Sequence, residues 1–177
     1  HLLHSEAIVP WADEVAKVTG GRVKINILPK VVGSVPAQYD VVSDGLADMG
    51  LFVPGYTPGR FNATAIGELP MLSDDPLVGA VAFNWLYETT LKQKDIFKGV
   101  HVVAMFTTSP GQIFTARKQV NTLADLRGLK LRSPLASTGP MLSAMGAVPV
   151  QKPVSELYEL MTSGIIDDRA AFWWGFF

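Results

Sequence analysis

The stretch Gly128-Leu129-Lys130-Leu131-Arg132-Ser133-Pro134 decides the fold class of this chain. It predicts a short strand that begins after a glycine and ends at a proline, a residue that central strands exclude. Strand alternation places Leu129 and Leu131 on one face and Lys130 and Arg132 on the other. An open α/β sheet presents such strand ends to a ligand cleft. If this strand belongs to such a sheet, Arg132 would face the cleft.

Predicted helices and strands alternate on both sides of this strand. Helical spacing of apolar residues predicts helices over residues 5–18, 36–44, 76–93, 137–145 and 155–164. Alternating or short apolar runs predict strands over residues 22–28, 49–53, 100–106, 112–116, 129–133, 148–150 and 166–172. This alternation favours parallel βαβ units and therefore an α/β fold. In the helix over residues 76–93, we expect four side chains to face inward: Leu77, Val81, Trp85 and Leu86.

One spacing pattern occurs twice, as Tyr39-x5-Gly45-x2-Asp48 and as Tyr158-x5-Gly164-x2-Asp167. In both copies the glycine ends a predicted helix and the aspartate lies on the connection to a strand. Either the match is chance, or the chain contains two similar α/β lobes whose facing strand ends form a cleft.

The composition excludes several classes of function. With 177 residues and 48% hydrophobic content, the chain can build one large domain or two small lobes. Its net charge of −1 offers no basic surface for nucleic acid or a membrane. It has no cysteine, and no apolar run reaches the roughly 18 residues of a membrane span. The start, His1-Leu2-Leu3-His4, does not resemble a signal peptide, so we expect an earlier segment to be absent or removed.

Residues suited to catalysis or metal binding are few. His1, His4 and His101 have no recognisable partners, and Asp74-Asp75 fits the start of a helix. No nucleophile elbow, phosphate-binding loop or dinucleotide fingerprint occurs. We therefore expect a binding protein without metal or cofactor, and an enzyme stays as an alternative.

Two polar features suit the binding of a small ligand. Arg132 offers a planar fork of donors that matches a carboxylate, although from spacing alone a surface salt bridge is the simpler explanation. The loop over residues 107–112 contains Ser109, Gly111 and Gln112, and its hydroxyl, amide and backbone groups could orient a ligand. An ordinary turn explains this loop equally well.

For the aromatic residues, a role in ligand binding and a role in the core are both open. Phe172, Trp173 and Trp174 could form the wall of a pocket, or they could belong to a core strand at the end of the chain. Tyr56 and Phe61, in a turn-rich loop, could cover a ligand or pack in the core.

Stretches spread over nearly the whole chain carry a resemblance to one family. They are residues 11–15 with 19–24, 54–56 with 59–61, 68–70, 107–112, 114–118, 123–134, 146–150 and 155–158. In this order they resemble the substrate-binding proteins of tripartite ATP-independent periplasmic (TRAP) transporters, often called C4-dicarboxylate-binding proteins.

The resemblance implies a periplasmic-binding-protein type II fold. Lobe I would cover residues 1–106, lobe II residues 107–177, and the hinge would lie near Thr107. It also implies a monomeric receptor in the periplasm, not embedded in the membrane. Such a receptor closes over a small organic acid and delivers it to the TRAP permease subunits.

The resemblance also assigns roles to individual residues. The arginine that pairs with the ligand carboxylate falls on Arg132. A second basic ligand residue of sialic-acid-binding members falls on Gln112, which argues against sialic acid here. The pocket wall falls on residues 171–174, and Tyr56 and Phe61 are expected at the lid. An aromatic wall suits a 2-oxo acid, an aromatic acid or another monocarboxylate, while the family name leaves a dicarboxylate open.

The chain departs from the family pattern in two respects. Family members are substantially longer, with a strand before the position of His1 and a tail after Phe177. Asp168 stands where the family has glycine, and residues 172–175 differ from the usual pattern. We therefore interpret the chain as an incomplete version of the receptor. The other alternative is a cytosolic effector-sensing domain of the same fold, but the basic face or helix-turn-helix of a coupled DNA-binding segment does not occur.

Overall fold

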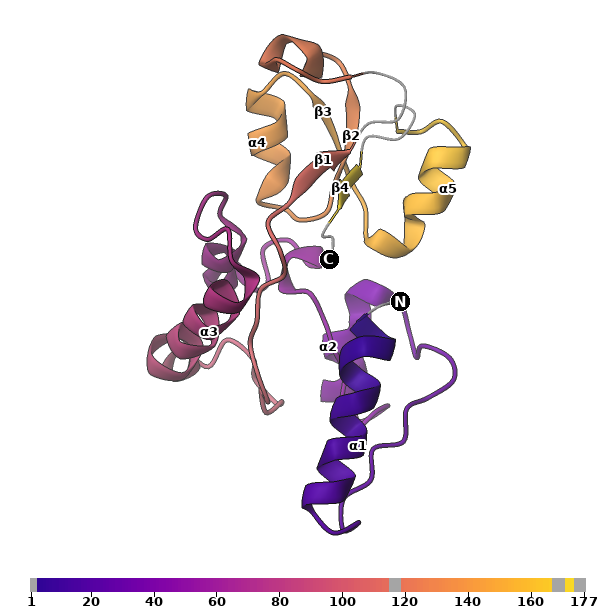
Figure 1. Cartoon of the computed structure of the whole chain (residues 1–177), viewed down its shortest axis with the longest axis vertical. Coiled ribbons are helices and arrows are strands. Elements are labelled where there is room, and N and C mark those ends of the chain that lie inside the picture. The colour runs from indigo at the N-terminus through magenta and orange to yellow at the C-terminus, as the bar shows by residue number, and fades with distance from the viewer. Residues whose placement is uncertain (1–2, 115–118, 167–170, 174–177) are drawn as a thin grey trace. The chain divides into compact units, whose positions relative to one another are not determined.

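The computed structural model describes residues 3–114, 119–166 and 171–173 (Figure 1). The chain divides into two compact units, one within residues 1–32 and one within residues 33–175, which we describe separately. The predicted lobe boundary between residues 106 and 107 is not this division and stays a prediction. None of the helices in the described ranges is long and apolar enough to cross a membrane.

The first unit contains the helix predicted over residues 5–18. A π-helical turn, His4–Ile8, leads into α1 (Val9–Val18), which has proline in its first turn as predicted. Gly20 and Gly21, with φ of +60° and +78°, end the helix. The strand predicted over residues 22–28 is wrong, because this extended segment joins no sheet in the described part of the chain. Alternation favours a strand only where a second strand supplies hydrogen bonds.

The second unit begins with the two helices predicted over residues 36–44 and 76–93. α2 (Gln38–Ser43) follows a 3₁₀ turn at Val35–Ala37, and further 3₁₀ turns lie at Pro54–Tyr56 and Asn62–Glu68. α3 (Pro76–Leu86) continues through a π-helical turn, Tyr87–Leu91, and a 3₁₀ turn, Lys92–Lys94. The Asp75 carboxylate caps α3 by accepting hydrogen bonds from two backbone N–H groups at 2.8 and 3.2 Å.

An aromatic cluster forms the core around α2 and α3. Its rings pack in tilted or edge-on pairs, with centroids between 5.0 and 6.3 Å apart. Its members are Tyr39, Phe52, Phe61, Tyr87 and Phe97. The predicted strands over residues 49–53 and 100–106 pack apolar side chains against this cluster, but neither joins a sheet within the described residues. Their apolar character therefore reflects burial of side chains, and the prediction that they are strands is wrong.

The remaining residues of this unit form one sheet with the strand order β1-β4-β2-β3 (Figure 1). Its strands are β1 (Gln112–Phe114), β2 (Lys130–Ser133), β3 (Val148–Gln151) and β4 (Ala171–Trp173). β2 pairs in parallel with β3 and β4, and β1 pairs antiparallel with β4. α4 (Thr138–Ala144) connects β2 to β3, and α5 (Leu157–Thr162) lies between β3 and β4. The predicted parallel βαβ units are confirmed here.

A second apolar cluster packs between this sheet and α4. Its buried members are Leu126, Leu131, Leu142 and Ala147, and Leu142 is completely inaccessible to solvent. The 3₁₀ turn Leu123–Leu126 begins with a capping box between Thr122 and Asp125. The sheet region therefore has its own core, separate from the aromatic cluster.

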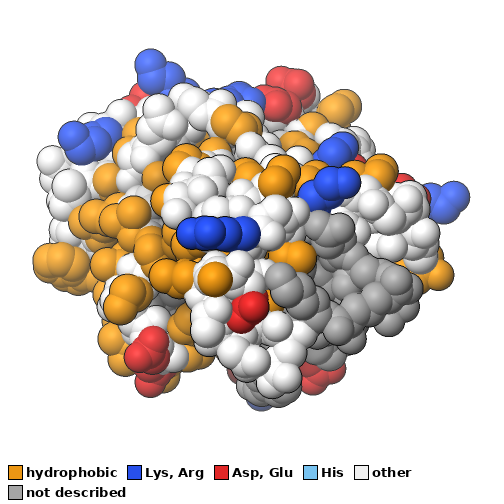
Figure 2. Space-filling view, turned by 90° about the horizontal axis from the view of Figure 1, so that it is seen from above, with side chains coloured by type: hydrophobic (Ala, Val, Ile, Leu, Met, Phe, Trp, Pro, Cys, Tyr) orange, Lys and Arg blue, Asp and Glu red, His pale blue; other side chains and the backbone are white. Residues whose placement is uncertain are grey.

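The outer face of α3 differs from the prediction. Leu77, Val81 and Trp85, expected to face inward, are 71%, 63% and 66% exposed. Leu86 does pack against the aromatic cluster, as does Phe83. α3 is apolar on all sides, so its sequence pattern does not distinguish the packed face from the open one. Figure 2 shows hydrophobic side chains gathered on the side of the molecule where α3 lies in Figure 1.

The repeated spacing pattern has the same backbone geometry in both copies. Gly45 and Gly164 have φ of +73° and +70° and end α2 and α5. In each copy the residue after the glycine donates its N–H to the carbonyl oxygen five residues earlier. Leu46 donates to Val41 at 2.9 Å, and Ile165 donates to Leu160 at 3.1 Å. The two helix ends are therefore alike, while Asp167 lies outside the described residues.

Candidate ligand-binding site

Arg132 lies at the carboxyl end of β2, in the middle of the sheet. Both neighbouring strands pair with it, because Arg132 is in register with Val150 of β3 and Ala171 of β4. Its side chain is 1% exposed, and its Nε donates to the carbonyl oxygen of Lys152 at 2.8 Å. The structure therefore excludes the simpler explanation of Arg132 as an exposed surface residue.

The alternation predicted for this strand is correct only at its start. Lys130 is exposed, but Leu131, Arg132 and Ser133 are all buried, so the end of β2 is covered on both faces. Burial lowers the pKa of the Arg132 guanidinium from its usual value. The guanidinium still keeps its charge at neutral pH, as arginine does in proteins. A buried, permanently charged fork is the kind of group that selects a carboxylate.

Tyr56 contacts Arg132 from a distant part of the sequence. It lies in the 3₁₀ turn Pro54–Tyr56, is half-buried, and its hydroxyl interacts with the Arg132 guanidinium, which opposes the pKa-lowering effect of burial. The structure therefore brings together two of the residues that we expected to bind the ligand.

The turn after β2 is held by buried hydroxyl groups. The hydroxyls of Ser133 and Thr138 lie 2.6 Å apart, and both contact the carbonyl oxygen of Leu135, at 2.9 and 2.8 Å. Ser133 is completely buried and Thr138 is 5% exposed. This network gives the backbone after Arg132 one defined conformation.

Glu68 and Ser137 also lie near this turn, and sequence reasoning did not select them as site residues. The Ser137 hydroxyl donates to the Glu68 carboxylate at 2.8 Å. Burial raises the pKa of Glu68 above its usual 4.5, although the hydrogen bond from Ser137 partly opposes this shift. The stretch over residues 68–70 contributed to the family resemblance, so a signal for Glu68 was present.

The other predicted ligand residues are dispersed. Phe61 is 5% exposed and packs in the aromatic cluster, so the structure gives it a core role, and its lid role stays a prediction. Ser109 and Gly111 are half-buried, and Gln112 is exposed on β1, which β4 separates from β2. The backbones of Phe172 and Trp173 lie in β4, while Trp174 and the side chains of the other two lie outside the description.

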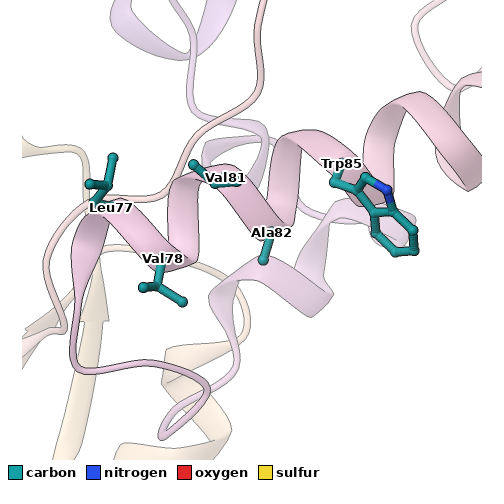
Figure 3. Close-up of a pocket in the computed structure, with 5 residues that line it drawn as sticks. All are labelled: Leu77, Val78, Val81, Ala82 and Trp85. Atoms are coloured by element: carbon teal, nitrogen blue, oxygen red, sulfur yellow. The ribbon is translucent and has the colours of Figure 1, made fainter.

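The described part of the chain contains no group of three histidine, cysteine, aspartate or glutamate side chains that could hold a metal ion. His4 and His101 are both exposed. A hollow on α3, shown in Figure 3, is lined by apolar side chains alone: Leu77, Val78, Val81, Ala82 and Trp85. It contains none of the predicted ligand residues, and none of its lining side chains carries a charge that could pair with a carboxylate.

Comparison with known proteins identifies the class of this chain as extracellular solute-binding proteins. The family model described as bacterial extracellular solute-binding protein, family 7, matches residues 1–172. The chain belongs to this family, which confirms the resemblance found in the sequence. The family consists of solute-binding proteins of transporters and not of enzymes.

Solved structures with the same fold contain bound aromatic acids. A TRAP periplasmic solute-binding protein from Bordetella bronchiseptica, with bound (R)- and (S)-mandelate, is 34% identical with a TM-score of 0.91. The match covers 98% of this chain and 54% of that one. A TRAP solute-binding protein from Rhodoferax ferrireducens, with copurified benzoate, is 33% identical with a TM-score of 0.88, covering 96% and 52% of the two chains. These two-lobed proteins of mixed α/β content confirm the predicted fold class.

A curated relative binds a different kind of acid. The 2,3-diketo-L-gulonate-binding periplasmic protein of Escherichia coli is 26% identical over 160 residues, which cover 88% of this chain and 48% of the relative. The chain spans about half the length of the curated relatives it matches.

Proposed function

We propose that this chain is part of an extracytoplasmic TRAP receptor for a small aromatic carboxylic acid, whose carboxylate pairs with Arg132. The observation that carries the proposal is the position of Arg132, a buried guanidinium at the carboxyl end of the central strand. Parallel sheets bind ligands at this end of their strands. In a site closed to water, a bidentate pair between arginine and a carboxylate is strong and selective.

The preference for an aromatic acid follows from the relatives. The two solved structures described above are 33–34% identical to this chain and contain mandelate or benzoate. Tyr56, beside Arg132, supplies an aromatic ring at the site. Gln112 is uncharged, so it supplies no second positive charge for a dicarboxylate, and it stands where sialic-acid-binding members have a basic residue, which argues against sialic acid. A 2-oxo acid is the next candidate to test.

The cellular context is proposed on the same grounds. The related proteins are named as periplasmic, and the family resemblance implies a receptor that passes its ligand to a membrane permease. We therefore propose a periplasmic location, delivery of the acid to TRAP permease subunits, and a monomeric receptor.

The test is calorimetric titration of the protein with benzoate, mandelate, succinate, pyruvate and sialic acid. We expect benzoate or mandelate to bind most tightly. Arg132→Ala should weaken that binding by about 2–5 kcal/mol, the usual cost of truncating one partner of a buried charge pair. Arg132→Lys should also bind poorly, because lysine keeps the charge but loses the planar fork.

The matched control is Lys130→Ala, which removes a positive charge from the same strand at an exposed position. It should leave the affinity within about twofold, as expected for a side chain distant from the ligand. Circular dichroism spectra establish that each variant is folded. An unchanged affinity in folded Arg132→Ala protein would exclude the proposed role of Arg132.

A further inference from the structure

Glu68 joins two segments that are far apart in the sequence. It ends the 3₁₀ turn Asn62–Glu68, and its Oε2 accepts a hydrogen bond from the Ser137 hydroxyl at 2.8 Å, across 69 residues of chain. Both side chains are half-buried. A carboxylate in such a position loses hydration, so the hydroxyl compensates for part of that loss.

Gly55 lies between the same two segments, close to Glu68 and to Leu135. A Cβ atom placed on Gly55 would come within 2.3 Å of Glu68 Oε1 and 2.8 Å of Leu135 Cδ2, so no larger residue fits without displacing them. The carbonyl oxygen of Gly55 also accepts a hydrogen bond from the N–H of Ala136 at 3.4 Å. Gly55 is therefore enclosed between the Glu68 carboxylate and the turn after β2.

The contact between Glu68 and Ser137 adjoins the candidate site through each of the two segments that it joins. Tyr56 follows Gly55 in sequence, and its hydroxyl interacts with the Arg132 guanidinium. On the other side, Ser137 lies between Leu135 and Thr138, whose bonds with Ser133 hold the turn that follows Arg132. A shift at Glu68 would thus change the separation of the Tyr56 hydroxyl and the Arg132 guanidinium.

We propose that Glu68, through its hydrogen bond with Ser137, is a positioning residue that holds Gly55 and Tyr56 over Arg132 and so slows the release of the bound acid. This inference rests on the proposed function, because it assigns Glu68 a role at the same carboxylate site. The raised pKa of Glu68 agrees with its enclosed position.

The first measurement needs no ligand. Amide hydrogen exchange of Ala136 reports the contact, because its N–H donates to Gly55. In Glu68→Ala we expect this amide to exchange about 10-fold faster, the change expected from losing a hydrogen bond to a charged group. Glu68→Gln should restore slow exchange, since an amide oxygen still accepts from Ser137. The matched control is Glu88→Ala, which removes an exposed glutamate paired with Lys92 and should leave Ala136 unchanged.

The second measurement is the dissociation rate of benzoate or mandelate by stopped flow. Glu68→Ala should release the acid about 10-fold faster than the wild-type protein. Glu68→Gln should release it at nearly the wild-type rate. Ser137→Ala should also speed release, but adding Glu68→Ala to it should have little further effect, because both changes remove the same bond.

The outcomes separate this inference from the proposed function. Unchanged exchange at Ala136 in Glu68→Ala overturns the proposed contact, whether or not an acid binds. Faster exchange with an unchanged dissociation rate means that Glu68 is only structural, which overturns the positioning role. If the wild-type protein binds none of the acids, the proposed function fails and the positioning role fails with it, whereas the exchange data still report on the contact itself.

Discussion

Tyr39 and Tyr158 occupy equivalent places in the repeated spacing pattern but have different surroundings. Tyr39 is 6% exposed, packs in the aromatic cluster and donates a hydrogen bond to the carbonyl oxygen of Lys98. Tyr158 is 78% exposed. Arg60 stacks on the ring of Tyr39, with its guanidinium carbon 4.6 Å from the ring centroid, and pairs with Asp40 at 2.7 Å. The hydrogen bond from Arg60 lowers the pKa of Asp40. The same residue at the same spacing is therefore a core residue in one copy and a surface residue in the other.

The tyrosine pair gives a prediction about a single hydroxyl. Tyr39→Phe should lower the free energy of unfolding by about 1 kcal/mol, because the part-buried hydrogen bond from the tyrosine hydroxyl to the Lys98 carbonyl is lost. Tyr158→Phe, in the equivalent position, should change it by less than about 0.5 kcal/mol, as exposed substitutions usually do. Urea denaturation followed by circular dichroism measures both. Equal effects of the two substitutions would contradict the assigned environments.

At the scale of elements, α3 and α4 differ in how far their leucines are buried. α4 buries Leu142 completely against the sheet, while no residue of α3 is buried to that degree and Leu77 is 71% exposed. α3 is nevertheless held on its inner side, where Asn84 accepts a hydrogen bond from the N–H of Met105 at 2.9 Å. Gly79 permits a close approach, because a Cβ there would lie 2.6 Å from the Thr107 hydroxyl.

A pair of identical substitutions tests this difference. Leu142→Ala should lower the free energy of unfolding by about 2–5 kcal/mol, because it removes apolar contacts and leaves a cavity. Leu77→Ala removes the same atoms from an exposed site and should cost less than about 1 kcal/mol. Both values come from denaturant unfolding of the purified variants. A Leu77→Ala effect as large as that of Leu142→Ala would show that this face of α3 is covered in solution.

At the scale of the whole molecule, the larger unit contains two separate cores. The aromatic cluster stabilises the segments around α2 and α3, and the second cluster stabilises the sheet with α4. The bond between Glu68 and Ser137 connects the segment before α3 to the turn before α4. Because Glu68 is an ionisable group with a shifted pKa, the stability of the folded chain should depend on its protonation.

The sign of this pH dependence follows from the direction of the shift. The folded chain binds the proton of Glu68 more tightly than the unfolded chain, whose carboxyl has a pKa near 4.5. The stability from this group is therefore fully present below about pH 4.5 and is lost as the pH rises through the raised pKa. We expect the free energy of unfolding of the wild-type protein to fall relative to Glu68→Gln over this range. Urea unfolding of both proteins at a series of pH values measures the difference, and a constant or rising difference would contradict the prediction.

Features that depend on local physics could be predicted from the residues alone. The helix ends at Gly45 and Gly164 follow from the freedom of glycine at positive φ, and the cap of α3 follows from Asp75 before Pro76. Strand β2 and the βαβ units around it follow from short apolar runs between helical segments, and the family follows from motifs along the whole chain. Arg132 was also visible in the sequence as a strand-end arginine.

Features that need a partner from elsewhere in the chain could not be predicted from the sequence and became visible in the folded chain. The segments over residues 22–28, 49–53 and 100–106 have strand-like patterns, but a strand needs a neighbour to supply its hydrogen bonds. The burial of Arg132, its interaction with Tyr56 and the contact between Glu68 and Ser137 depend on residues 20 to 76 positions away. Periodicity contains no information on such contacts, because it reports only which side chains share a face and not what covers that face.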